Sequence, residues 1–140
     1  MAILGVWTNA KVIVNSVDRS DHCTTVSVET SRDEVDVTAF GAANKVVMPG
    51  LGDGTIRATF LVDFVAGGLD EALQALSVAT VGFPIEVRPV NSGRTTSNPA
   101  YVMTCLMYGY TPISGGIGDA ATIDVTFRNA SQTGLQRLTA

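Results

Sequence analysis

The chain has little of what a histidine-dependent or metal-dependent site needs. Its 140 residues include one histidine, His22, and two cysteines, Cys23 and Cys105. His22 directly follows Ser20 and Asp21 in a polar turn, and consecutive side chains cannot converge as a Ser-His-Asp triad must. A zinc site built from the histidine and both cysteines would lack a fourth ligand. The sequence therefore predicts no catalytic, cofactor-binding or metal site, and no enzyme.

Other signals are absent too. No apolar run approaches the roughly 18 residues of a membrane-spanning helix, so no membrane partner is expected. Residues 1–4 lack the basic start and long apolar core of a secretory signal, which favours two free thiols in a reducing compartment over a disulfide. Nine Lys and Arg against 13 Asp and Glu give a net charge of −4. That balance disfavours a nucleic-acid-binding function through a basic face.

Two glycine-rich segments match nucleotide-binding signatures only superficially. Residues 116–121 fit G-x-G-x-x-A but precede a predicted strand, whereas a dinucleotide site needs this motif to open a helix. Residues 50–54 lack the Lys-Ser/Thr that completes a P-loop. Both segments are therefore interpreted as turns.

What the sequence does contain is apolar alternation with a period of two, which is typical of half-buried strands. It predicts strands at 11–15, 24–30, 55–64, 83–90, 101–110 and 121–128. Pro84 and Pro89 predict an edge position for the strand at 83–90. The strand at 101–110 is apolar on both faces, so we expect a second cover, for which a neighbouring subunit is a candidate.

A single helix is predicted after Asp70, with one apolar stripe formed by Leu69, Leu73 and Leu76. The expected fold is therefore mainly β, a β-sandwich or partly open barrel of about six or more strands with one flanking α-helix. We expect one domain over residues 1–140, with a patternless tail at 129–140. Trp7 is expected in the core, with an interface as the alternative.

The most unusual segment is residues 31–54, where five turn-forming residues precede the strand at 55–64: Gly41, Pro49, Gly50, Gly52 and Gly54. This composition predicts a long loop. A loop of that length in a small domain usually binds something. We therefore interpret it as an interaction loop.

Several of these segments together resemble the tail tube proteins of tailed bacteriophages, whose fold is also used by small capsid-decoration and minor capsid proteins of actinobacterial phages. The resemblance covers about residues 11–127. It rests on five motifs: Asp-Val-Thr at 36–38, the Gly-Leu and Asp-Gly-Thr-Ile steps at 50–56, Asp70 opening a Leu-rich helix, Phe-Pro-Ile-Glu-Val-Arg-Pro at 83–89, and Gly-Asp followed by Ile-Asp-Val-Thr-Phe at 118–127.

The resemblance implies a virion structural protein assembled in the bacterial cytoplasm. Six copies would join their sheets into a ring, and rings would stack through the loop at 31–54 around a lumen that DNA passes without specific binding. Tail terminator and tape measure proteins would be further partners. The implied stacking contacts are Phe40, Lys45, Val46, Val47, Met48 and Leu51.

Two alternatives stay open from the sequence. A capsid-decoration protein would use the same loop to bind the major capsid protein, as a trimer or another small oligomer. A small-ligand-binding β domain or an enzyme would need a pocket with converging polar groups, and the polar residues here lie mainly in turns and on alternating strand faces.

Overall fold

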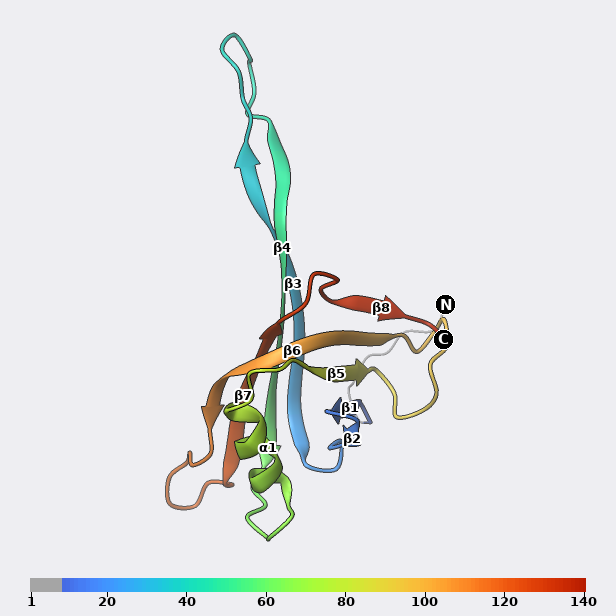
Figure 1. Cartoon of the computed structure of the whole chain (residues 1–140), viewed down its shortest axis with the longest axis vertical. Helices are drawn as coiled ribbons and strands as arrows, with labels where there is room; N and C mark the ends of the chain where they lie inside the picture. The colour runs from blue at the N-terminus through green and yellow to red at the C-terminus, as the bar shows by residue number, and fades with distance from the viewer. Residues whose placement is uncertain (1–8) are drawn as a thin grey trace.

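A computed structural model describes residues 9–140, so the prediction for Trp7 lies outside the described part of the chain. The strands and the one described helix follow in the order β1 (Lys11–Val14), β2 (Val17–Asp18), β3 (Cys23–Asp36), β4 (Val47–Leu61), α1 (Leu69–Ser77), β5 (Phe83–Arg88), β6 (Ala100–Thr111), β7 (Thr122–Asn129) and β8 (Gln136–Leu138). Figure 1 shows their arrangement. Within residues 9–140, no helix has the length and apolar character to cross a membrane.

All eight strands belong to one antiparallel sheet in the order β2-β1-β5-β6-β7-β4-β3, with β8 also pairing with β6. The first half of β6 pairs with β5 on one side and with β8 on the other, and its second half pairs with β7. The sheet folds over a single core without closing. The predicted mainly β fold, a partly open sheet with one flanking helix, is confirmed.

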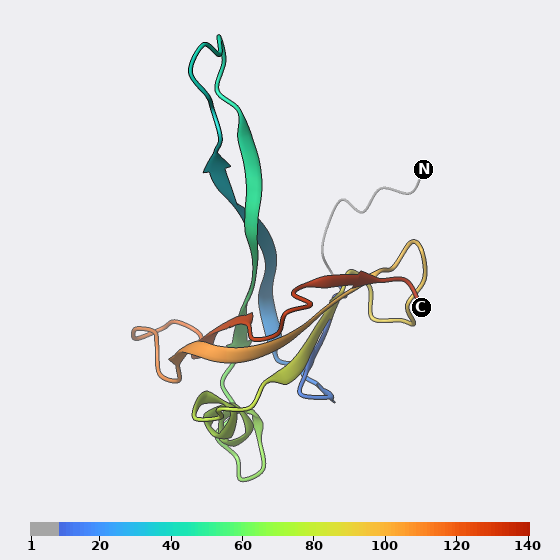
Figure 2. The same cartoon turned by 45° about the horizontal axis from the view of Figure 1, so that its top comes forward.

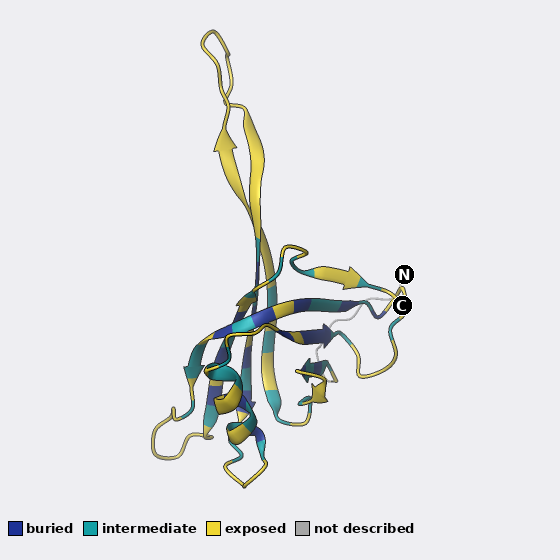
Figure 3. Cartoon of the chain, viewed as in Figure 1, coloured by how far each residue is buried: buried dark blue, intermediate teal, exposed yellow. Residues whose placement is uncertain are grey.

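The core follows directly from the period-two alternation. On β4, Ile56 and Phe60 are fully buried, and they pair with Phe127 and Ile123 of β7, whose side chains are buried as well. Across the core, the Phe83 ring of β5 meets the Phe127 ring edge-on, with centroids 5.9 Å apart, a favourable aromatic geometry. Figure 3 shows the buried residues concentrated where the two halves of the sheet face each other.

The predicted edge position of the strand at 83–90 is wrong, because β5 lies between β1 and β6. Pro84 is the second residue of β5, close to the strand start, where the missing N–H of proline is tolerated. Its carbonyl still accepts a hydrogen bond from the Asn15 N–H at 2.8 Å. Pro89 follows the end of the strand and interrupts nothing.

Two further segments differ from the expectation. The tail at 129–140 contains β8, which pairs with Ala100, Tyr101 and Val102 of β6. Helix α1 begins one residue before Asp70, with Gly68 at the N-cap and no side-chain cap. Asp70 instead accepts a hydrogen bond from the Tyr110 hydroxyl, which ties the first helical turn to β6.

Candidate assembly surfaces

The segment predicted as a loop at 31–54 is mostly β-structure. Strands β3 and β4 pair as far as Asp36 and Val47, with register shifts on the way, so only residues 37–46 form a connection. Strand β4 pairs with β7 only from Thr55 onward. Residues 31–54 therefore form a two-stranded hairpin, here called the arm, which projects from the sheet in Figures 1 and 2.

The glycines that suggested a loop occupy strand positions. Gly52 and Gly54 continue the core-facing phase of Ile56 along β4, and Gly50 lies at a shift in the register with β3. A Cβ at Gly54 would lie 3.0 Å from the Met103 sulfur and 3.3 Å from the Leu135 Cβ, so close packing at the base of the arm favours glycine there. The register shifts between Arg32 and Glu34, opposite Pro49, and a bulge of this kind is a usual place for proline in a sheet.

Every residue from 31 to 52 is exposed. The six side chains predicted as stacking contacts all lie on the arm: Phe40, Lys45 and Val46 in the connection, and Val47, Met48 and Leu51 on β4. The Phe40 ring has no cover at all, and Leu51 is 82% exposed. The sequence reasoning missed the exposed Val35 and Val37, which the alternation Val35-Asp36-Val37 could have indicated.

The end of the arm is held by its own hydrogen bonds. The Val37 N–H donates to the Val46 carbonyl at 2.9 Å, and the Val46 N–H donates to the Thr38 hydroxyl at 2.8 Å. Hydrogen bonds from Thr38 to the Asp36 carboxylate lower the pKa of that group. The arm is therefore ordered locally, yet a two-stranded ribbon with no third strand is marginal in water. Exposed apolar side chains gathered on one segment are typical of surfaces that bind another protein.

Strand β3 ends the sheet, so its outer edge has no strand partner among residues 9–140. The strand has 14 residues, which makes a long edge of unpaired N–H and C=O groups. Such an edge readily pairs with another chain. The arm therefore exposes apolar side chains, and the outer edge of β3 exposes unpaired backbone groups.

The face of β3, β4 and β7 that points away from the core is largely polar, and it carries two pairs of opposite charges. Arg57 lies 3.8 Å from the Glu29 carboxylate, and Arg128 pairs with Asp53. The Thr59 hydroxyl donates to the Asp124 carboxylate at 2.8 Å. Because both ion pairs are solvent-exposed, each contributes little stability, but each offsets a positive charge on this face.

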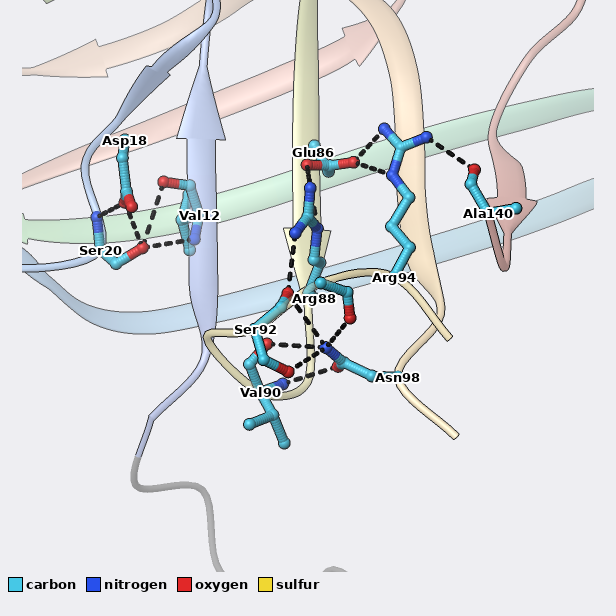
Figure 4. A network of polar contacts seen from close by, with 11 residues as sticks. Val12, Asp18, Ser20, Glu86, Arg88, Val90, Ser92, Arg94, Asn98 and Ala140 are labelled. Carbon is cyan, nitrogen blue, oxygen red and sulfur yellow. Dashed lines mark hydrogen bonds and ion pairs between the residues drawn. The ribbon is translucent and has the colours of Figure 1, made fainter. Parts of the chain in front are cut away.

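A cleft of about 1040 Å³ lies between β1 and β3, where the sheet fails to close, and Val12, Cys23, Val26 and Tyr101 are among its lining residues. Several of its polar groups are bonded within the chain. The Val12 N–H donates to the Ser20 hydroxyl at 2.8 Å, a contact visible in Figure 4. The two charged side chains of its lining, Asp21 and Arg88, are bound to His22 and Glu86.

Figure 4 also shows a charged cluster at the C-terminal end of β5. Glu86 is 7% exposed, and its carboxylate accepts hydrogen bonds from Arg88 at 2.7 Å and from Arg94 at 2.7 Å. The buried Asn98 amide bonds the carbonyls of Val90, Ser92 and Gly93. This cluster fixes the connection between β5 and β6 and has no open position for a ligand.

The two cysteines are free thiols. Burial raises the pKa of the Cys105 thiol to about 12 and also raises that of Cys23, so both side chains are neutral at physiological pH. Among residues 9–140, no three His, Cys, Asp or Glu side chains are grouped so as to hold a metal ion.

Searches with family models and against curated proteins find no match. Solved structures do match over nearly the whole chain. A chain from the tail of an empty gene transfer agent particle with C6 symmetry has a TM-score of 0.70 at 14% identity, covering 99% of this chain and 100% of that one. A chain from the sheath-tube complex of an extracellular contractile injection system, PVC, has a TM-score of 0.70 at 15% identity, covering 99% and 93%.

The protein has a tail-tube-like fold. The match includes the arm, because almost every residue of the chain is covered. A chain from the PVC sheath/tube terminator shares the tail-tube-like fold at a TM-score of 0.72 and 17% identity, covering 98% of this chain and 97% of that one. At these identities the comparison defines the fold, and the roles of individual side chains follow only from the geometry described above.

Proposed function

We propose that this protein is a structural, non-enzymatic subunit of a tailed-phage-like virion, and specifically its tail tube subunit. Six copies form a ring, and rings stack into a tube around a lumen that DNA passes. The arm carries this proposal, because the exposed apolar side chains of a hairpin that projects from a folded body are explained by burial against another copy. The tail and sheath-tube origin of the matching folds supports the same assignment.

Ring closure would use the free edge of β3. A neighbouring copy that adds its sheet to this edge satisfies the unpaired backbone groups, and a closed ring of sheets leaves no edge exposed. The half-buried Leu106 and the exposed Tyr108 lie on the outer face of β6. A neighbouring subunit would supply the second cover that the sequence predicts for this strand.

The polar face of β3, β4 and β7 would line the lumen. A lumen for DNA must not bind phosphates, because each uncompensated Lys or Arg adds a salt-dependent contact. Here Arg57 and Arg128 are each paired with a carboxylate. The resulting surface is hydrated and has no free positive charge on these two side chains.

Both candidate roles assign the arm to an interface. The tail tube is preferred over the capsid-decoration role because the matching assemblies are tails and sheath-tube complexes. Other partners in the particle would then be the tail terminator and the tape measure protein. A decorating protein would instead form discrete trimers or monomers and bind empty capsids. This difference makes assembly the decisive property.

The proposal is tested by replacing Met48 and Leu51 with Asp. Both side chains are exposed, so the variant should fold normally, while two new charges on the apolar arm should prevent stacking. Circular dichroism would measure folding, and sedimentation velocity with electron microscopy would measure assembly. Val78→Asp with Val81→Asp is a matched control, since these valines are 71% and 79% exposed but lie outside the arm.

Loss of the folded subunit in the arm variant would contradict the assignment of these residues as contacts. Stacking equal to that of the unmodified protein would contradict the role of the arm. In either case the control variant should fold and stack normally.

A further inference from the structure

The cleft between β1 and β3 has apolar side chains on both of its walls. One wall includes Val12 of β1 and Val87 of β5, and the other includes Val26 and Val28 of β3. Val28 lies opposite Ile56 of β4. Ile56 is fully buried, whereas both β3 valines are only half-buried. The core is therefore covered less completely along β3 than along β4, on the side where the cleft lies.

The cleft has the size and shape to hold a short peptide segment. Its volume is about 1040 Å³, at the upper end of the roughly 300–1,000 Å³ of pockets that enclose a small-molecule ligand. On β3 its lining extends from Cys23 to Thr30, and this stretch of strand is about 26 Å long at about 3.3 Å per residue. A cleft that follows a strand over this length fits an extended peptide better than a compact ligand.

Residues 1–8, which lie outside the described part of the chain, have a composition that suits this cleft. Their sequence is Met-Ala-Ile-Leu-Gly-Val-Trp-Thr, and it contains no charged side chain. Ile3 and Trp7 alternate with Leu4 and Val6, so an extended backbone would present apolar side chains on both of its sides. Apolar residues on both sides are typical of an extended segment that is buried on two faces.

The described part of the chain starts at the rim of the same cleft. Asn9 and Ala10 both line it, and the Asn91 N–H donates to the Asn9 carbonyl at 2.7 Å. This hydrogen bond fixes the point at which residues 1–8 join the folded body. An extended segment of that length reaches about 26 Å, which matches the length of the β3 wall. Because the segment is attached at the rim, its effective concentration at the cleft is much higher than that of a separate molecule.

We propose that residues 3–7 of each copy bind in the cleft between β1 and β3 of the same copy, with their apolar side chains packed between the two walls. The segment then covers Val26 and Val28 and shields the Cys23 thiol. It contacts the side chains on the inner face of β3, whereas a neighbouring copy would use the backbone edge of that strand. The contact belongs to the single folded subunit and does not depend on the proposed tube function.

Intrinsic fluorescence tests this inference directly, because Trp7 is the only tryptophan of the 140 residues. The protein is diluted until sedimentation velocity shows single subunits. In these subunits Trp7 should emit at short wavelength and be quenched only weakly by acrylamide, and denaturant should restore the emission and quenching of a solvated indole. A solvated Trp7 in the folded single subunit would overturn the inference. Burial of Trp7 only in assembled protein would also contradict it, because the segment would then contact a neighbouring copy.

The reaction of Cys23 with a thiol reagent gives a second readout, from the cleft itself. Cys105 is fully buried, so Cys23 should react first. Leu4→Asp should raise the Cys23 reaction rate about tenfold or more, because burial of one leucine shifts a docking equilibrium by roughly that factor and the rate follows the open population. Val81→Asp is the matched control, since this valine is exposed and lies outside the cleft lining.

Circular dichroism would confirm that both variants are folded, and mass spectrometry would identify the modified thiol. The control should react at the rate of the unmodified protein. An unchanged Cys23 rate in the Leu4→Asp variant would show that residues 3–7 do not cover the cleft.

Discussion

Phe60 and Phe127 are the two largest side chains that the fold buries completely. Phe60, near the C-terminal end of β4, points into the core that both halves of the sheet share. Replacing Phe60 with Ala should lower the free energy of unfolding by roughly 3–5 kcal/mol, because a cavity replaces a large buried ring. Chemical denaturation of assembly-defective protein would measure this loss without a contribution from the tube.

Phe40→Ala is the matched control for Phe60→Ala. The Phe40 ring is fully exposed at the arm tip, so its removal should leave the stability of the isolated subunit unchanged. An unchanged unfolding midpoint for Phe60→Ala would show that the assigned core face of β4 is wrong.

At the residue scale, sequence reasoning succeeded where burial repeats with period two. The alternation of Ile56, Ala58 and Phe60 placed these residues on the core side of a strand, and the structure confirms it. The same alternation did not predict that Glu86 is buried, because it marks this residue only as a polar position within an apolar strand. Its burial depends on Arg94, eight residues away across a connection whose path the pattern does not specify.

At the scale of elements, the connection between β5 and β6 is held by charge rather than by apolar packing. The Glu86→Gln variant removes the carboxylate that Arg88 and Arg94 share and leaves two partly buried guanidinium groups without a counter-charge. The free energy of unfolding should fall by about 3 kcal/mol, the lower end of the cost of breaking a buried ion pair. Hydrogen exchange in residues 89–99 should become faster.

Glu29→Gln provides the comparison for this prediction. Glu29 also pairs with an arginine, but its side chain is 66% exposed, and an exposed pair contributes about 1 kcal/mol or less. Equal stability losses in the Glu29 and Glu86 variants would contradict the account of the cluster.

The arm shows where element boundaries escape a single sequence. Gly50, Gly52 and Gly54 are ordinary turn residues by composition, so residues 31–54 were predicted as a loop. The pairing with β3 nevertheless continues through them, with Gly52 opposite Arg32 and Gly54 opposite Thr30. The deciding factors are the close packing at Gly54 and the pairing with β3, and neither is local to the segment. The interaction role of this segment stays a prediction.

At the scale of the whole molecule, this tail-tube-like fold exposes two surfaces that have no cover among residues 9–140: the arm and the outer edge of β3. The fold class could be predicted because short alternating strands and one amphipathic helix permit few architectures. The arrangement of these surfaces could not be predicted from the sequence, because it depends on how far β3 and β4 extend beyond the rest of the sheet. On β4, residues 47–54 lie beyond the pairing with β7, and at about 3.3 Å per residue they give a reach on the order of 26 Å.

The central claim is that these surfaces bring copies of this chain together into a hollow tube. Negative-stain electron microscopy of the purified protein across a concentration series tests it most directly. Our account predicts six-membered rings that stack into hollow tubes whose length increases with concentration. Discrete monomers or trimers at every concentration would contradict it.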